Sequence, residues 1–137
     1  MTGCVLDTDV VIAALDRRDA HHAQATAAIT EMIDEEVALL LSLVNYAETL
    51  VKPAETEPTM RAALDALNAL GIRLVAPTPA IARDAARHHA HSISLADGFA
   101  IATAHARGAS LASFDLRVRR ALPATGVQLA AALAAQA

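Results

Sequence analysis

Apolar and polar residues alternate along the chain in blocks that predict short strands separated by helices. Several short apolar runs end at a turn or capping residue, as is typical of strands buried in a sheet. The expected strands are Gly3–Leu6, "VALLLSL" at 37–43, "IRLVAP" at 72–77, "ASLASFD" at 109–115 and, as a fifth candidate, "GVQLA" at 126–130.

Helices are predicted between these strands by apolar residues at helical spacing and by residues that cap or stop a helix. Ser94 is placed to cap a helix that Gly108 ends, and Asp19 is placed to cap an earlier one. The predicted helices cover 20–35, 45–52, 60–70, 80–91, 95–107 and 116–122, and the segment 10–15 either continues the first strand or turns into a helix. Strands that alternate with helices favour an α/β fold with a mainly parallel, roughly five-stranded sheet.

Composition narrows the class of protein. The 137 residues match one ordinary domain, 1–137. Apolar residues make up 55% of the chain and aromatic residues only 2%, so Ala, Leu, Val and Ile must fill the core. The apolar runs are shorter than the roughly 20 residues needed to span a bilayer, and no cationic, apolar leader precedes the first strand. We therefore expect a cytoplasmic protein that does not enter the membrane.

Cysteine content and charge exclude some kinds of site. Cys4 is the only cysteine, which rules out an internal disulfide and a cysteine-rich zinc site. The formal charge of −4, from 11 basic and 15 acidic residues, argues against a protein that coats nucleic-acid duplexes nonspecifically. It does not exclude a metal-dependent nuclease, because bound divalent cations reverse the local charge that a phosphate meets.

Acidic residues occur where ligand-binding groups are expected in an α/β fold. Asp7 ends the first apolar run and Asp115 follows another, so both are expected at the carboxyl edge of the sheet, where such folds bind ligands. Glu48 lies on the helix after the second strand, and Asp97 lies in the first turn of its helix. If these acids converge, they should shift their pKa values or hold divalent cations. Oxygen ligands of this kind suit Mg²⁺ or Mn²⁺.

Four short motifs resemble those of a known family. The motifs "VLDTDVVIAAL", "NYAETL", "LADGFAIATAHARG" and "LASFD" stand in the order and rough spacing of the four acidic motifs of the PIN-domain nucleases. The compact length is similar to that of the VapC toxins of prokaryotic VapBC toxin–antitoxin pairs. The resemblance runs from Val5 to about Val127 and implies a PIN-like three-layer α/β/α sandwich.

The resemblance also implies functional residues. By position, the metal ligands and catalytic acids of the family correspond to Asp7, Glu48, Asp97 and Asp115. Ser113 is similar to a hydroxyl residue often found near the last acid, where it could hydrogen-bond an acid, a metal-bound water or a phosphate. Asp9 stands where many relatives have Asn or Ser, so it is either a fifth carboxylate or, slightly favoured, a cap for the next helix. Gly98, next to Asp97, departs from the family pattern and weakens the early helix.

The activity implied by the resemblance is that of a Mg²⁺-dependent endoribonuclease, with Mn²⁺ as a substitute, in which metal-activated water hydrolyses RNA phosphodiester bonds. Such a toxin implies a cognate VapB-type antitoxin and a homodimer. Arg117, Arg119 and Arg120 follow Asp115 closely and could contact the RNA backbone, although an exposed charged helix face explains them about as well.

Alternative interpretations remain open on the sequence alone. Taken singly, Asp97 and Glu48 are explained as a helix N-terminal acid and a solvent-exposed helix residue. Asp115 is explained about as well as a cap for the helix at Leu116, so the joint pattern carries the metal site. "LDTDVV" also resembles the opening of haloacid-dehalogenase-type phosphatases, with Asp7 as nucleophile and Asp9 as acid or base, but the sole lysine, Lys52, comes too early. A receiver domain lacks its later Asp and Lys here. A catalytically silent PIN-like binding module is the non-enzymatic alternative.

Overall fold

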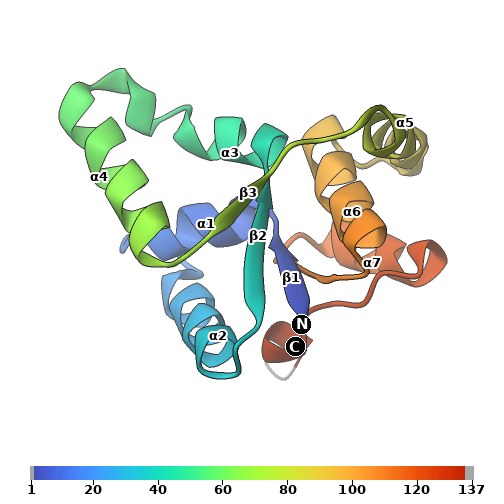
Figure 1. Cartoon of the computed structure of the whole chain (residues 1–137), viewed down its shortest axis with the longest axis horizontal. Coiled ribbons are helices and arrows are strands. Elements are labelled where there is room, and N and C mark those ends of the chain that lie inside the picture. The colour runs from blue at the N-terminus through green and yellow to red at the C-terminus, as the bar shows by residue number, and fades with distance from the viewer. Residues whose placement is uncertain (1, 135–137) are drawn as a thin grey trace.

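The computed structural model describes residues 2–134, which fold as a parallel sheet flanked by helices (Figure 1). The strands are β1 (Gly3–Leu6), β2 (Ala38–Ser42), β3 (Arg73–Val75) and β4 (Ser110–Ala112). The helices are α1 (Thr8–Leu15), α2 (His22–Asp34), α3 (Leu43–Leu50), α4 (Glu57–Ala69), α5 (Pro79–His88), α6 (Leu95–Arg107), α7 (Leu116–Thr125) and α8 (Ala131–Ala134), with short 3-10 turns η1 (Pro53–Glu55) and η2 (His89–His91).

The sheet has the order β3-β2-β1-β4, and every neighbouring pair is parallel. Val5 in β1 lies opposite Leu40 of β2 on one side and Leu111 of β4 on the other. The chain adds β2 and β3 on one side of β1 and then returns to add β4 on the other side. This reversal is a topological switch point, and ligands of α/β sheets bind at the carboxyl ends of the strands beside it.

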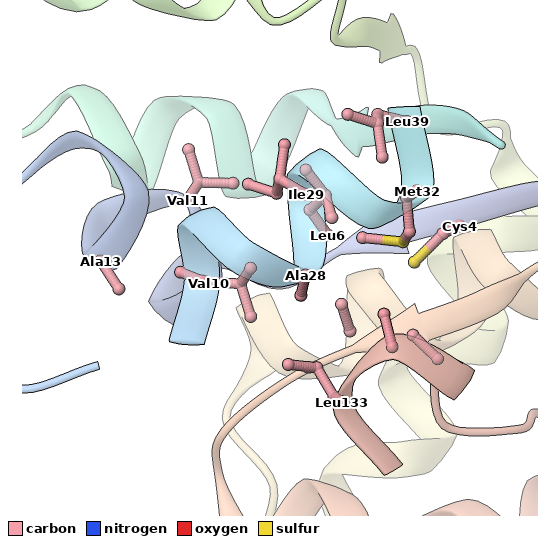
Figure 2. Packing of buried hydrophobic residues seen from close by; sticks show 14 of the residues in the cluster. Cys4, Leu6, Val10, Val11, Ala13, Ala28, Ile29, Met32, Leu39 and Leu133 are labelled. Atoms are coloured by element: carbon pink, nitrogen blue, oxygen red, sulfur yellow. The ribbon is translucent and has the colours of Figure 1, made fainter. Parts of the chain in front are cut away.

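Helices cover both faces of the sheet, as expected for a three-layer α/β/α sandwich. In Figure 1, α1, α2 and α4 lie on one side of the strands, and α5, α6 and α7 lie on the other. Alternate residues of β1 point to opposite layers. Cys4 and Leu6 join the cluster with Ile29 and Met32 of α2 (Figure 2), whereas Val5 joins the cluster with α6 and α7. Burial on both faces explains why the strands read as continuous apolar runs.

The expected fifth strand at 126–130 does not form, and the sheet of the described residues has four strands. Leu129 makes only an isolated parallel bridge to Leu111, through hydrogen bonds from Leu111 N to Gln128 O and from Ala130 N to Leu111 O. The segment is short because α7 continues to Thr125, beyond the expected end at 122, and α8 begins at 131. The parallel, helix-flanked architecture itself is confirmed.

Capping hydrogen bonds set several helix ends. Ser94 Oγ accepts from Asp97 N at 3.1 Å and Gly108 adopts a left-handed conformation, so α6 has the predicted bounds. In contrast, α3 begins before the predicted 45, because Ser42 Oγ accepts from Val44 N. Asp19 binds His21 N in a turn before α2 and does not cap that helix, which begins at 22 and not at 20. No helix within residues 2–134 is long and apolar enough to cross a membrane.

Candidate functional site

Asp7 lies at the carboxyl end of β1 and is almost fully buried, with 1% of its surface exposed. Its backbone N–H donates to Ala112 O of β4 at 2.9 Å, which joins the ends of the two strands at the switch point. Its side chain is the N-cap of α1: Oδ1 accepts from Thr8 N at 2.9 Å, and Oδ2 accepts from the Ser113 hydroxyl at 2.8 Å. A carboxylate is therefore fixed at this edge by hydrogen bonds to both oxygens.

Ser113 links the first acid to the last one. Its buried hydroxyl donates to Asp7 and accepts from Asp115 N at 3.2 Å. Asp115 in turn is the N-cap of α7, with Oδ1 accepting from Arg117 N at 2.8 Å. The Ser113 hydroxyl was expected to bond an acid, a metal-bound water or a phosphate, and in the structure it bonds an acid, Asp7.

Asp97 is half-buried in the first turn of α6. Burial raises the pKa of its carboxyl group, hydrogen bonds with Ser94 and with Asp7 oppose that rise, and the negative charges of Asp115 and Glu48 add to it. Because Asp7, Asp115 and Glu48 all affect the pKa of Asp97, Asp97 lies near these three acids from distant segments. Glu48 itself is exposed on α3, so it lies at the rim of the group.

The structure corrects the slightly favoured interpretation of Asp9 as a helix cap. Asp7 already caps α1, and Asp9 lies inside the first turn, where its Oδ2 accepts from Phe114 N at 3.0 Å. The Phe114 ring stacks on His21, with centroids 4.4 Å apart. Within the described chain, Asp9 Oδ1 is buried without a hydrogen-bond partner. Burial is the main cause that raises the pKa of Asp9 to about 6, and the charge of Asp97 contributes.

Asp7, Asp9, Asp97 and Asp115, with Glu48 at the rim, are called the acidic cluster below. Burial raises the pKa of Asp7 well above its ordinary value, and the charges of Asp9 and Asp97 raise it further. Across residues 2–134, the ionic contacts formed by arginine or histidine involve Asp16, Asp19 and Asp84 and none of the cluster. The described part of the chain thus brings negative charges together without a cationic side chain of its own bound to them.

The chemistry of the acidic cluster fits a hard divalent cation. Its ligand atoms are carboxylate oxygens, which Mg²⁺ and Mn²⁺ prefer, and the repulsion between the carboxylates would be relieved by positive charge. The unpartnered Asp9 oxygen is a further free donor. No group of three or more His, Cys, Asp or Glu side chains in the described chain has the geometry of a metal site. The fit therefore rests on donor chemistry and charge, and not on a preformed coordination shell.

The three arginines of α7 differ in their surroundings. Arg119 is half-buried, and its Nε donates to Ser113 O at 2.7 Å. This hydrogen bond holds the turn between β4 and α7. Arg117 and Arg120 are exposed and line a hollow beside α7. Of the three arginines that could contact RNA or form an exposed charged helix face, these two are the exposed ones.

Asn45 is a positioning residue that the sequence pattern did not reveal. It is fully buried, and its Nδ2 donates to Thr8 Oγ1 at 3.0 Å and to Ala96 O at 3.1 Å. One side chain of α3 thereby joins the start of α1 to the start of α6, the two helices that carry Asp9 and Asp97. Its only signal in the sequence is a polar residue three positions before Glu48.

Gly98 has a packing role that explains its departure from the family pattern. A Cβ atom at this position would lie 2.7 Å from the backbone oxygen of Ala85 in α5. The missing side chain lets α5 approach α6 closely beside Asp97, at the expense of some helix propensity.

The chain matches a known protein family, and its fold is similar to solved structures. Residues 4–121 match the family model described as PIN domain. No curated protein sequence matches significantly. Among solved structures, VapBC2 from Rickettsia felis bound to a DNA fragment from their promoter has a TM-score of 0.70 at 12% identity, over 93% of this chain and 97% of that one. FitAcB from Neisseria gonorrhoeae has a TM-score of 0.68 at 22% identity, over 95% and 98%. VapC20 from Mycobacterium tuberculosis, a sarcin-ricin loop cleaving toxin, has a TM-score of 0.66 at 20% identity, over 86% and 94%. At these identities the similarity is one of fold.

Proposed function

This chain belongs to the PIN domain family, and we propose that it is a Mg²⁺-dependent endoribonuclease that acts as the toxin of a type II toxin–antitoxin pair. The observation that carries the proposal is the acidic cluster at the carboxyl edge of β1 and β4, which no basic side chain of the described residues neutralises. Of the known activities of such an oxygen-only site, metal-assisted hydrolysis of a phosphodiester fits best.

The proposed ligands are Asp7, Asp97 and Asp115, with Glu48 bound directly or through water. These residues would hold Mg²⁺ or Mn²⁺, and such an ion would supply positive charge to the scissile phosphate and would lower the pKa of a bound water. The carboxylates alone are acceptors and would repel RNA. Ser113 holds the Asp7 carboxylate in place.

Asp115 keeps one oxygen free for a ligand. Its Oδ1 accepts from Arg117 N and caps α7, and its other oxygen makes no hydrogen bond to the residues described. Asp9 adds a second free oxygen, so it is proposed as an additional ligand in place of its expected capping role.

We set aside the haloacid-dehalogenase interpretation, because residues 4–121, which would have to form the phosphatase fold, match the PIN family. The silent binding module is an outcome of the following test.

The test is cleavage of a panel of end-labelled RNAs by purified protein freed of any partner, with Mg²⁺, with Mn²⁺ and with a chelator. Metal-dependent cutting that the Asp97→Asn variant lacks is the expected result. The exposed Asp65→Asn variant on α4 is the matched control and should cut like the parent. A panel that stays intact in every condition, or is cut equally by Asp97→Asn, contradicts the assignment and favours the silent module.

The antitoxin is proposed to occupy an apolar groove that reaches the acidic cluster. Similar folds occur in VapBC complexes, which supports a VapB-type partner. A groove of about 450 Å³ between α1, α3 and the η1 region is lined by Ile12, Leu15, Val51 and, at the cluster, Glu48. Val51 is 70% exposed. A segment with apolar side chains in this groove could place a basic side chain on Glu48.

The groove proposal is tested by Val51→Asp, which should weaken the complex with the cognate antitoxin, measured by calorimetry. Val51→Ala should weaken it less, because it removes area without adding a buried charge. RNA cleavage by the free protein should be unchanged in both. An unchanged affinity in Val51→Asp would place the antitoxin elsewhere.

A homodimer is also proposed. Several large apolar side chains are exposed, including Leu74 on the edge strand β3 and Ile33 on α2, and such surface favours association. Light scattering should give twice the chain mass of 14.2 kDa. A mass of one chain over a wide concentration range would contradict the dimer.

A further inference from the structure

We propose that the hollow beside α7 binds a backbone phosphate of the substrate RNA, separate from the phosphate that is cleaved; this inference rests on the proposed ribonuclease function. The hollow has a volume of about 400 Å³ and lies between α7 and the end of α5. Its lining residues are His88, Arg117, Arg120, Ala121, Ala124 and Thr125.

The sequence of α7 builds this phosphate pocket on one helix face. Arg117, Arg120, Ala121 and Ala124 recur at intervals of three and four residues, which places them side by side along the helix. The short side chains of the two alanines form the base of the pocket, and the longer side chains of the two arginines lie beside it. Two basic residues beside two small ones thus form a concave, positively charged site.

The two arginines of the pocket are available to a ligand. Both are exposed, and the ionic contacts of residues 2–134 do not include them. Arg18, in contrast, lies 3.6 Å from Asp16, and Arg119 donates to Ser113 O. A pair of guanidinium groups matches the geometry of phosphate oxygens better than other side chains do.

His88 forms the wall opposite α7. Its Nε2 lies 3.6 Å from Asp84 Oδ1 one turn earlier on α5, and Asp84 Oδ2 lies 3.7 Å from His105 Nδ1 on α6. The second contact joins α5 to α6, and the first fixes His88 at the end of α5. The positive charge of the pocket is therefore assigned to the arginines, and His88 is assigned the role of shaping it.

The pocket begins next to the acidic cluster. Asp115 caps α7 through Arg117 N, and Arg117 is the first lining residue on that helix. With a rise of about 1.5 Å per residue, Arg120 lies roughly 7–8 Å further along the helix axis than Asp115. One RNA strand can thus span from the cluster to the pocket.

The charge of the protein explains why such a pocket is needed. The chain has a net charge of −4, and the acidic cluster repels phosphates wherever a cation does not compensate it. Only three residues are aromatic, so base stacking contributes little to the affinity for a single strand. A local pair of arginines supplies the electrostatic binding that the molecule as a whole lacks.

The experiment measures RNA binding as a function of salt concentration. An Asp97→Asn background prevents cleavage, and the test variant adds Arg117→Gln and Arg120→Gln. The matched control replaces Arg61 on α4 and Arg73 on β3 by Gln, which removes the same charge at the other edge of the sheet. A third variant with both pocket arginines replaced by Lys keeps the charge.

The expected result is a weaker complex for the Gln pair, with the slope of log K against log salt smaller by about 1 for each arginine that contacts phosphate. The control pair should keep the parent slope, and the Lys pair should keep most of it. In the active protein, the Gln pair should raise KM for RNA.

The outcomes separate this inference from the function on which it rests. If the parent binds and cleaves RNA but the Gln pair has the slope and KM of the control pair, the phosphate pocket is overturned and the ribonuclease stands. If the parent neither binds nor cleaves any RNA of the panel, the ribonuclease proposal falls and the pocket falls with it.

Discussion

At the scale of single residues, Asp7 combines two tasks that usually fall to different side chains. It caps α1 and receives the Ser113 hydroxyl, which are structural contacts, and it is the most deeply buried member of the acidic cluster. The hydrogen bonds favour its charged form, whereas burial and the neighbouring acids disfavour it more strongly. The metal-free protein therefore contains unfavourable charge at its proposed active site.

The first prediction concerns Asp7→Asn. The amide keeps an acceptor for Thr8 N and a group that can hydrogen-bond Ser113, while it removes one charge from the cluster. Cleavage of RNA should be abolished, and the metal-free variant should be at least as resistant to urea as the parent. Full activity would contradict the role of Asp7, and a large loss of stability would contradict the repulsion inferred for the cluster.

A second prediction concerns pH. The pKa of Asp9 is about 6 in the folded protein, against 3.8 for an unperturbed aspartate, so the folded state binds more protons between these values. The free energy of unfolding of the metal-free protein should therefore fall as pH rises from about 4 to about 6, by roughly 2–3 kcal/mol for this group. The raised pKa values of Asp7 and Asp97 act in the same direction.

Thermal unfolding with chelator present measures this effect. Asp9→Asn should flatten the decline across the window, and Asp65→Asn, on the exposed side of α4, should not. If Asp9→Asn has the same pH dependence as the parent, or a steeper decline, the raised pKa of Asp9 is contradicted.

The residues of the site differ in how far the sequence could reveal them. Asp7 and Asp115 follow apolar runs, so the rule for the carboxyl ends of strands was sufficient to bring them together. Asn45 could not be found this way, because its importance comes from two partners on helices distant in sequence. Asp9 was misjudged because either of two nearby aspartates could cap α1, and only the backbone shows that Asp7 does so.

At the scale of elements, the contact between α5 and α6 depends on one missing side chain. Gly98 faces the backbone of Ala85, and Ile81, Ala85 and Ala102 form a small apolar cluster between the two helices with Phe99 beside it. This packing explains a glycine inside the first turns of α6, where propensity alone argues against it.

The third prediction is that Gly98→Ala destabilises the protein. In an open helix this change would stabilise by up to about 1 kcal/mol, but here the new Cβ would lie 2.7 Å from Ala85 O. Displacing α5 should cost about 1–3 kcal/mol, measured as a lower urea midpoint. The reverse substitution Ala106→Gly, at an exposed position of α6, should show the ordinary propensity effect. A more stable Gly98→Ala variant would refute the close approach.

The fourth prediction separates Arg119 from its neighbours on α7. Its Nε holds Ser113 O at the turn that also carries Asp115, so we assign it a positioning role. Arg119→Met should lower kcat several-fold with little change in KM for RNA and no change in the salt slope of binding. If Arg119 instead contacts RNA, the variant should raise KM and reduce the slope by about 1.

Element order and type could be predicted because each apolar run or helical pattern is a local signal. The predicted boundaries were less accurate where a side chain formed a hydrogen bond that the pattern did not indicate. Ser42 caps α3 before the predicted start, and Asp19 accepts a hydrogen bond within the turn before α2. The fifth strand failed because "GVQLA" has the composition of a strand, but α7 and α8 leave it room for only one bridge at Leu129.

At the scale of the whole molecule, the sheet order places three surfaces next to one another. The acidic cluster lies at the switch point between β1 and β4, the phosphate pocket follows along α7, and the apolar groove begins at Glu48. The sequence predicted a parallel sheet but not its strand order, because order depends on which edges the crossing helices leave open. Substrate and antitoxin are thus proposed to meet the same acids from opposite sides.

The proposed metal-binding role of the acidic cluster is tested most directly by a calorimetric titration of the partner-free protein with Mn²⁺. The titration is made above the pKa of Asp9, about 6, so that this carboxylate is ionised. We predict saturable binding that is lost in Asp7→Asn and retained in Asp65→Asn. Absence of binding in the parent protein, or equal binding by all three proteins, would contradict a cation site in the acidic cluster.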